Sequence, residues 1–505
     1  MNISAAKKVI KDTVSIYLMK DDDGEYRIPL VRQRPVFMVG APGIGKTAIM
    51  EQIASELGIA LVSYSMTHHT RQSALGLPFI TKKEYGGDEY SVTEYTMSEI
   101  IASVYDAISE SGIKEGILFL DEINCVSETL GPSMLQFLQY KTFGRHSVPD
   151  GWVIVTAGNP PEYNRSVREF DVATLDRLKV ISVEPELKVW RDYASDKNIH
   201  GAIMGYLDVK KDDFYVMEMT SEGRSYVTAR GWEDLSKMIE LSEELELTVD
   251  ETLISQYLRV DRVVKDFAAY YDLYKKYKKD YRIAEILAGS PPAGAFAKAA
   301  EAGFDERLSV LGMLFDAVSS EARAVMERSD LLSALVPVLK GFKASAESGA
   351  PLSEALNVLK NASDAAAKKL KSLKAAGALS DADKKILKAS AAFYDDMIRA
   401  VNDASCESAS SAFALVNTAF EKKVTLLKNE SLSAGAKLSC MIRFVNEAYK
   451  GGNEPVILAA RLTSDNWTSR FIGSFGNAEY EELARDMEIS ERGNELKQRI
   501  LNLDL

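Results

Sequence analysis

Short apolar runs alternate with helical patterns from about residue 33 to residue 185 of the chain. Most of these runs are apolar throughout, which is typical of parallel strands that are covered on both faces. The predicted strands are 35–39, 60–65, 116–120, 152–156 and 180–183. Helical patterns, such as those of residues 48–57 and 97–109, separate them. Strands that alternate with helices predict an α/β domain with a largely parallel sheet.

The strand pattern nearly disappears after Pro185. Residues 186–288 have a helical pattern that ends at the breaker Gly289-Ser290-Pro291-Pro292. The remainder, residues 289–505, reads as helices rich in Ala, Lys, Leu and Ser. We therefore predict three parts, which are an α/β domain over 1–185, an all-α lid over 186–288 and an all-α C-terminal region over 289–505. The last part carries no motif that names a chemistry, and its role stays open.

The composition is that of an ordinary globular protein, with 505 residues, 46% hydrophobic and 27% charged. Its 61 Lys and Arg against 74 Asp and Glu give a net charge of −13. That balance argues against a protein that coats nucleic acid or anionic lipid through bulk charge. Nucleic acid is therefore a disfavoured partner, although a local basic patch remains compatible with the sequence.

Neither secretion nor membrane insertion is expected from this sequence. The three cysteines, Cys125, Cys406 and Cys440, are far apart and form neither a disulfide framework nor a metal-ligand spacing. No apolar run approaches the 18 or more residues of a membrane span, and the N-terminal segment lacks the apolar core of a signal peptide. We expect a cytoplasmic protein.

A glycine-rich segment follows the first predicted strand directly and leads into a helix. It reads Gly40-Ala41-Pro42-Gly43-Ile44-Gly45-Lys46-Thr47, with Ala48 opening the helix, and it matches the phosphate-binding pattern G-x-x-x-x-G-K-[ST]. The glycines let the loop wrap closely, so that backbone N–H groups and the positive helix end face phosphate oxygens. Lys46 would reach the β- and γ-phosphates, and the Thr47 hydroxyl would bind Mg²⁺. The segment predicts a site for a nucleotide and Mg²⁺, and the family resemblance given below implies that the nucleotide is ATP.

Two carboxylates, Asp121 and Glu122, end the third predicted strand. Because open α/β sheets bind ligands at the carboxyl ends of their strands, both would lie beside the phosphate loop. We predict that Asp121 holds Mg²⁺ through water. Glu122 would polarise the water that attacks the γ-phosphate.

Asn159 and Arg177 complete the candidate set. Asn159 follows the fourth predicted strand, where its amide would orient the attacking water or contact the γ-phosphate. An Asn-Pro turn without such a role is the alternative. Arg177 lies where a short helix meets the last strand, at the rim of the domain, and it would face outward.

The order of these elements resembles that of an AAA+ ATPase. Gly40–Thr47 matches Walker A, the run ending at Glu122 matches Walker B, and Asn159 matches sensor 1. Arg177 matches the arginine finger that acts on a neighbouring subunit, and Arg168 lies close enough to compete for that role. The resemblance implies that Arg230, in the segment YVTARGW, is sensor 2 on the lid, although Ala229 stands where the family often has proline.

The phrases TAGNP and ATLDRLKVI are closest to the MoxR-like branch of this family. In that branch, an insert such as residues 71–95 forms a central-pore loop, and the segment 141–151 resembles the hairpin before sensor 1. The resemblance covers about residues 1–288. It implies a hexameric ring that uses ATP to remodel a protein client, often together with a protein that carries a von Willebrand factor A domain.

Two other functions fit the same motifs. One is a nucleic-acid motor or loader, which the acidic balance disfavours, and the other is a nucleotide-gated scaffold with little turnover, which an intact Glu122 and Arg177 disfavour. A stripe of four tyrosines at 270, 274, 277 and 281 alternates with lysines and resembles a nucleic-acid surface. Its helical spacing instead favours packing into a core. The client, the ring stoichiometry and the pathway are not encoded in any motif.

Overall fold

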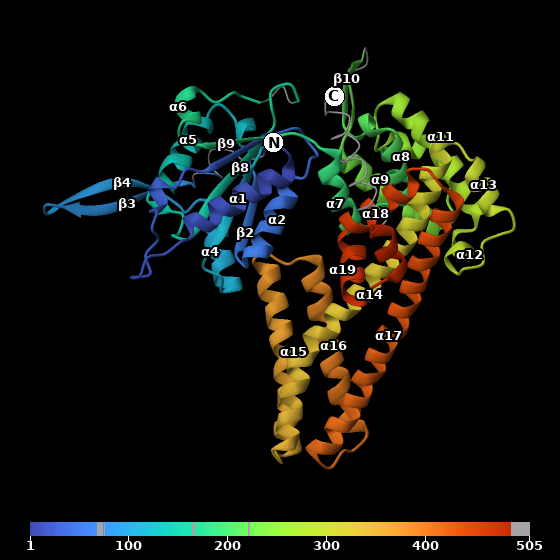
Figure 1. Ribbon diagram of the computed structural model, residues 1–505. Helices are drawn as coiled ribbons and strands as arrows, with labels where there is room; N and C mark the ends of the chain where they lie inside the picture. The colour runs from blue at the N-terminus through green and yellow to red at the C-terminus, as the bar shows by residue number, and fades with distance from the viewer. Residues whose placement is uncertain (68–73, 75, 164–166, 221–222, 486–505) are drawn as a thin grey trace, which may run out of the picture. The chain divides into compact units, whose positions relative to one another are not determined.

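The structure, a computed structural model, describes residues 1–67, 74, 76–163, 167–220 and 223–485 (Figure 1). By compactness the chain divides into two units. The first unit contains Met1–Glu186 together with Lys360–Asp396, and the second contains Leu187–Leu359 together with Met397–Leu505. The chain therefore passes between the units at three places.

A five-stranded parallel sheet forms the centre of the first unit. Its strands, in spatial order, are β2 (Ala60–Ser65), β5 (Gly116–Asp121), β8 (Trp152–Gly158), β1 (Val36–Gly40) and β9 (Lys179–Val183). These are the five predicted strands, with ends that differ by at most two residues. The interior residues of β5 and all of β8 are buried, as expected for a sheet covered on both faces. The predicted α/β fold class is confirmed.

Helices and a short hairpin lie around this sheet, and a longer hairpin, β3–β4 (residues 78–95), projects away from it (Figure 1). Asn2 caps the first helix, and Ala6, Ile10 and Val14 line its buried face at intervals of one turn. The remaining elements of the first unit are, in order, α1 (Ile3–Tyr17), η1 (Leu30–Arg32), α2 (Lys46–Leu57), β3 (Pro78–Tyr85), β4 (Asp88–Tyr95), α4 (Glu99–Ser111), η2 (Ile123–Cys125), α5 (Gly131–Tyr140), β6 (Thr142–Phe143), β7 (His146–Ser147) and α6 (Val172–Leu175).

The described part of the second unit is helical apart from one β-hairpin. Its elements are α7 (Leu187–Lys197), α8 (Gly201–Val209), η3 (Lys211–Phe214), β10 (Val216–Thr220), β11 (Gly223–Val227), α9 (Ala229–Glu244), α10 (Glu251–Ser255), α11 (Asp261–Tyr281), α12 (Ile283–Leu287), α13 (Ala295–Glu301), α14 (Phe304–Glu347), α17 (Ala409–Ala448), α18 (Glu454–Ser464) and α19 (Asn466–Phe475). The antiparallel β10–β11 hairpin interrupts the region expected to be helical after Pro185. Two further helices, α15 (Leu352–Ala375) and α16 (Asp381–Asp403), each begin in one unit and end in the other.

One hydrophobic core runs through the second unit and draws on residues from both sides of position 288. Trp232 and Phe267, from before that position, share the core with Leu311 and Leu438 from after it. The lid segment and the C-terminal helices of this unit therefore depend on each other for burial. Among the described helices, none is long and apolar enough to cross a membrane.

The tyrosine stripe of α11 belongs to this core, which confirms the packing expectation. Tyr274 and Tyr281 are buried, and Tyr270 and Tyr277 pack against the core from its edge. The hydroxyl of Tyr281 donates to Glu306 Oε1 at 2.7 Å, which satisfies its polar end. The tyrosines are therefore structural rather than a stacking surface for bases.

A buried carboxyl on α14 makes the stability of the second unit depend on pH. Asp316 Oδ2 is shielded from solvent and has no hydrogen-bond partner among the described residues. Burial raises the pKa of Asp316 to about 7, and the nearby charge of Asp465 adds to this. In the unfolded chain the same carboxyl has its ordinary pKa of 3.8. The folded state therefore holds a proton between about pH 4 and pH 7 that the unfolded state releases, so stability falls as pH rises through that window.

We expect Asp316→Asn to remove this pH dependence, because the amide mimics the protonated acid. The stability advantage of the variant over wild type should grow as the pH rises from 4.5 to 7.5. Each kcal/mol of that advantage corresponds to about 2–4 °C in melting temperature. Thermal unfolding followed by circular dichroism at several pH values measures the gap. Glu347→Gln, at the exposed end of the same helix, is the control and should show no such trend. A gap that is constant with pH would contradict the assignment.

Candidate functional site

The phosphate loop has the backbone geometry that its glycines predict. Gly43 and Gly45 have φ angles of 72° and 91°, which only glycine adopts at little cost, and α2 begins at Lys46 directly afterwards. Gly40 is needed for a different reason, since a Cβ there would lie 2.7 Å from the carbonyl oxygen of Val183 on β9. The loop therefore follows the neighbouring strand closely and delivers the first turn of α2 to the carboxyl edge of the sheet.

Lys46 joins two neighbouring strands at this edge. Its side chain is only 9% exposed, and its Nζ donates to the carbonyl oxygens of Gly40 at 2.7 Å and Ala41 at 2.9 Å. The third acceptor is Asn159 Oδ1, at 2.8 Å, which follows β8. A buried ammonium needs such acceptors. A phosphate oxygen in the loop would compete for the same donor, so the structure brings the predicted phosphate lysine and the predicted sensor amide together.

Thr47 and Asp121 form an oxygen pair beside the loop. The Thr47 hydroxyl donates to Asp121 Oδ2 at 3.3 Å, and Asp121 Oδ1 accepts the Glu122 N–H at 2.9 Å. A hydroxyl and a carboxylate are ligands that suit Mg²⁺, which keeps several waters and takes further oxygens from phosphates. The residues present fit that ion. Among the described residues no group of three or more His, Cys, Asp or Glu is arranged to hold a metal.

Glu122 has a backbone conformation that is rare for its residue type. Its φ of 56° lies in the left-handed region, which costs a non-glycine residue about 1–2 kcal/mol. Its Oε2 accepts a hydrogen bond from the Thr67 hydroxyl and a longer one, 3.4 Å, from Ser65 at the end of β2. The carboxylate is thus held at the end of a neighbouring strand. Strain of this kind is often concentrated at functional sites.

Asn124, which belongs to no sequence motif described above, links three parts of the site. It is only 5% exposed, and its Nδ2 donates to the main-chain oxygen of Asn159 at 2.8 Å. Its own carbonyl accepts the N–H of Arg168 at 2.9 Å. It also lies against Gly158, where an added Cβ would approach its Oδ1 to 2.3 Å. The only hint in the sequence is a polar residue in an otherwise apolar turn after Glu122.

The two candidate rim arginines are both exposed. Arg177 follows α6 and donates from Nη1 to the carbonyl oxygen of Ala173 at 3.1 Å. Arg168 forms an ion pair with Glu128, with 2.6 Å between Nη2 and Oε1. Neither side chain bonds to the phosphate loop of its own chain in any described contact. Arg230 is exposed in the first turn of α9, in the second unit, and its sensor role stays a prediction.

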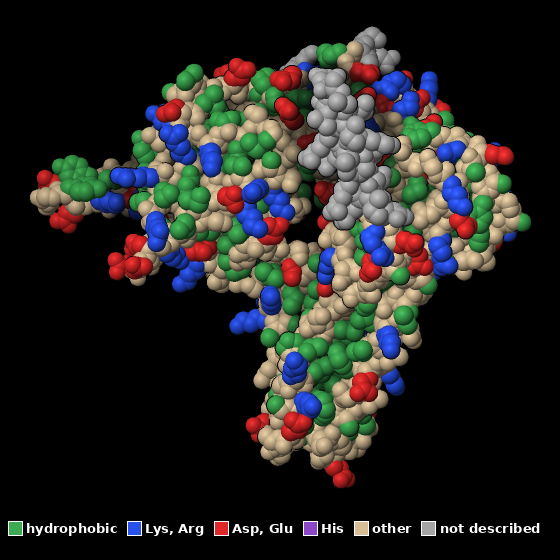
Figure 2. Space-filling view, viewed as in Figure 1, with side chains coloured by type: hydrophobic (Ala, Val, Ile, Leu, Met, Phe, Trp, Pro, Cys, Tyr) green, Lys and Arg blue, Asp and Glu red, His purple; other side chains and the backbone are tan. Residues whose placement is uncertain are grey.

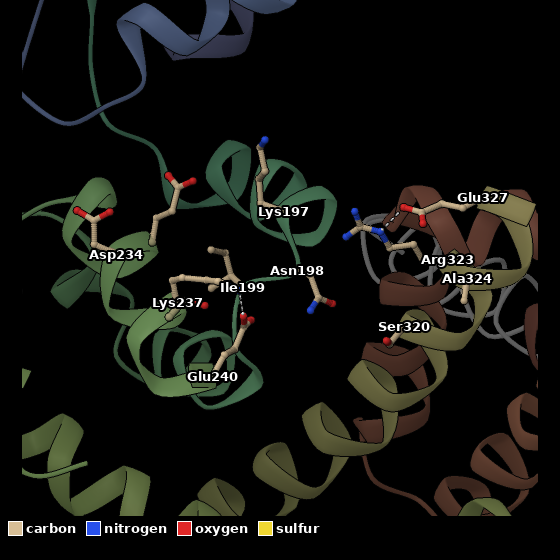
Figure 3. Close-up of a pocket in the computed structure, with 12 residues that line it drawn as sticks. Lys197, Asn198, Ile199, Asp234, Lys237, Glu240, Ser320, Arg323, Ala324 and Glu327 are labelled. Carbon is tan, nitrogen blue, oxygen red and sulfur yellow. Dashed lines mark hydrogen bonds and ion pairs between the residues drawn. The ribbon is translucent and has the colours of Figure 1, made fainter. Parts of the chain in front are cut away.

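A separate pocket of about 620 Å³ lies in the second unit between the turn after α7, helix α9 and helix α14 (Figure 3). It is lined by side chains of both charges. Lys237 pairs with Glu240 at 3.0 Å, and Arg323 pairs with Glu327 at 3.1 Å. Because no phosphate-loop residue lines the pocket, it does not correspond to the predicted nucleotide site.

Residues 35–178 match the family model described as the AAA domain of the dynein-related subfamily. The match begins at the first strand of the sheet and includes the phosphate loop, Glu122, Asn159 and Arg177. It supports an AAA+ ATPase with a nucleotide-binding domain. No curated protein matches the chain at a significant level.

We expect Asn124→Ala to slow ATP turnover while leaving nucleotide affinity nearly unchanged. The change removes the donor that holds Asn159, whereas Lys46 and the loop are untouched. Loss of one such bond should lower kcat by about tenfold. Steady-state ATPase assays and titration with a fluorescent ATP analogue separate the two quantities. Asn417→Ala, which removes a half-buried amide on α17 that bonds only to Glu421 among the hydrogen bonds described, is the control. A loss of affinity with unchanged kcat would contradict this role.

Proposed function

We propose that the protein is a Mg²⁺-dependent AAA+ ATPase of the MoxR-like type that works as a ring and remodels a protein client. The observation that carries this is the meeting of Lys46, Thr47, Asp121, Glu122 and Asn159 at one edge of the sheet. They reach it from three adjacent strands, β5, β8 and β1. Together these residues supply the chemistry that phosphoryl transfer requires, which is charge neutralisation, metal ligation and orientation of water.

The roles follow from the contacts. Lys46 would exchange its carbonyl partners for phosphate oxygens. Thr47 and Asp121 would hold Mg²⁺, which would neutralise charge on the phosphates. Glu122 accepts a proton from the attacking water once its carboxylate leaves Thr67. Asn159, held by Asn124, stays within reach of both Lys46 and the terminal phosphate. Turnover therefore requires Glu122 to change partners.

An arginine from a neighbouring subunit would complete the site. Positive charge supplied in trans to the transferring phosphoryl group is worth about 10³–10⁵ in rate. Arg177 is exposed at the rim and is our candidate for this group, with Arg168 as the alternative. A contact that brings a rim residue to the next subunit's site is heterologous, and such contacts close into rings or open into filaments. We propose a ring, and a hexamer by resemblance to the family.

The β3–β4 hairpin supports a protein client over nucleic acid. It exposes apolar and aromatic side chains, namely Phe79, Ile80, Tyr85, Tyr90 and Tyr95. Figure 2 shows hydrophobic side chains gathered toward its end. The hairpin carries two lysines against four carboxylates, at Glu84, Asp88, Glu89 and Glu94. Exposed apolar surface favours contact with polypeptide, and net negative charge disfavours contact with a phosphate backbone. Residues 71–73 and 75 of the predicted pore insert lie outside the described residues.

A partner with a von Willebrand factor A domain is proposed from the family resemblance alone. Its docking site would lie on the helices of the second unit that the AAA domain match does not include. A nucleic-acid motor is the rival function. Stimulation of ATP turnover by DNA or RNA that disappears at higher salt would favour that rival.

The trans-acting arginine is tested by mixing two inactive variants. Arg177→Ala keeps its phosphate loop but offers its neighbour no arginine, and Lys46→Ala offers Arg177 but binds no nucleotide productively. Each alone should lose about 10³-fold in kcat. Where the two variants alternate in a ring, an intact loop meets an intact arginine, so the mixture should regain turnover. ATPase assays across mixing ratios, with mass photometry to follow assembly, measure this.

The same mixing with Arg168→Ala is the matched control. Recovery with Arg168→Ala but not with Arg177→Ala would reverse our assignment of the finger. An Arg177→Ala monomer that hydrolyses ATP at the wild-type rate would reject trans activation. In that case the ring proposal would lose its catalytic reason.

A further inference from the structure

The turn that joins α15 to α16 is attached to the nucleotide-binding sheet. We call residues 372–380 the hairpin tip. Ala376, just after α15, accepts a hydrogen bond from the Leu61 N–H on β2 at 2.6 Å. Ser372 donates from Oγ to the carbonyl oxygen of Ser111, the last residue of α4, at 2.6 Å. Ala376 and Ala378 are 0% and 2% exposed, so the tip is packed as well as hydrogen-bonded. Figure 1 shows the turn beside β2 and α4.

Gly377 makes this close approach possible. Its φ is 64°, in the left-handed region, and a Cβ built on it would lie 2.6 Å from the carbonyl oxygen of Leu61. Any other residue would therefore meet two obstacles, backbone strain and a collision with β2. Gly349, after α14, offers a comparison, since its φ is 77° but a Cβ there would meet nothing within 4 Å. Gly377 is therefore required both by its φ angle and by the close contact with β2, whereas Gly349 is required only by its φ angle.

The attachment uses the free side of an edge strand. β2 is the last strand of the sheet, and among the described strands it pairs only with β5. The Ala60 N–H faces β5 and donates to Glu115, whereas the next N–H, that of Leu61, faces away from the sheet. An unpaired N–H on an edge strand is a ready site for another chain segment. The carbonyl of Ala376 occupies that site.

The opposite end of β2 holds Glu122. Ser65 ends the strand, and both Ser65 and Thr67 donate to Glu122 Oε2. Leu61 and Ser65 are four residues apart, or about 13 Å along an extended strand. β2 pairs with β5 over its whole length, from Ala60 with Gly116 to Ser65 with Asp121. The tip and the Thr67 contact therefore restrain two ends of one short strand.

We propose that the hairpin tip is a positioning element for Glu122 that acts through β2. While the tip is attached, β2 stays in place and Thr67 keeps the Glu122 carboxylate away from the attacking water. Release of the tip loosens that hold. Because α15 and α16 continue into the second unit, they link that unit to β2, in addition to the chain crossing at residues 186–187 that follows β9. The inference rests on the proposed ATP hydrolysis, and it assigns to part of the C-terminal helical region the control of basal turnover.

The test compares Gly377→Ala with Gly349→Ala in the full-length protein. Both add one methyl group at a positive φ, but only the first collides with β2. We expect Gly377→Ala to raise kcat for ATP about fivefold, the effect of weakening one hydrogen-bonded restraint, with KM unchanged. Gly349→Ala should leave both constants at wild-type values. Hydrogen exchange at residues 60–65 should increase in Gly377→Ala alone. Ser372→Ala, a milder change, should shift kcat in the same direction and guards against misfolding of the glycine variant.

A double-mutant cycle with Thr67→Val shows whether the tip acts through Glu122. Thr67→Val removes the donor to the carboxylate and should raise kcat by itself. In that background Gly377→Ala should add nothing, because the restraint it weakens is already absent. Additive effects would overturn the proposal. If the wild-type protein hydrolyses ATP, equal kcat values for Gly377→Ala and Gly349→Ala would overturn it as well. A wild-type protein that binds ATP without turnover would instead reject the proposed function, and this inference with it.

Discussion

The site depends on the placement of one buried ammonium. Lys46 lies at the start of α2, yet it is satisfied by carbonyls of its own loop and by an amide from β8. That arrangement requires β1 and β8 to be neighbours, which the strand order β5-β8-β1 provides. A buried charge without acceptors would cost several kcal/mol. The loop, the sheet order and Asn159 are therefore linked by a single requirement, and phosphate can bind by replacing acceptors already in place.

Much of the fold and of this site could be predicted from the sequence because the signals are local. An apolar run followed by a phosphate loop, or by paired carboxylates, predicts both a strand and the chemistry at its end. Parallel strands then bring these ends to one edge of the sheet. The β10–β11 hairpin was missed because its strands are short, and one of them carries the polar sequence Gly223-Arg224-Ser225. The periodicity of the surrounding helices is stronger than that of such strands.

Other features could not be predicted because each is defined by a partner far away in the chain. Thr67 is an unremarkable hydroxyl until the fold brings it to Glu122, and Asn124 becomes informative only beside Asn159. The tip of the α15–α16 hairpin is the extreme case. In the sequence, Ala376 and Gly377 look like an ordinary helix-ending turn. Their role becomes visible only in the fold, where the Leu61 N–H on the edge strand donates to Ala376. Pairings of this kind leave no periodicity and no motif in the sequence.

The edge strand β2 then explains why a helical region outside the AAA domain match can matter to its chemistry. A bare edge would invite pairing with other chains, and the hairpin tip covers part of it. The same strand ends beside the strained Glu122, so covering the edge and restraining the carboxylate use one element. Strain at Glu122 persists only where surrounding contacts hold it. Among the described residues, the hydroxyl donors to that carboxylate, Ser65 and Thr67, are both at the end of β2. On the proposal made above, any element that holds β2 would act on the balance between the held and the released states of Glu122.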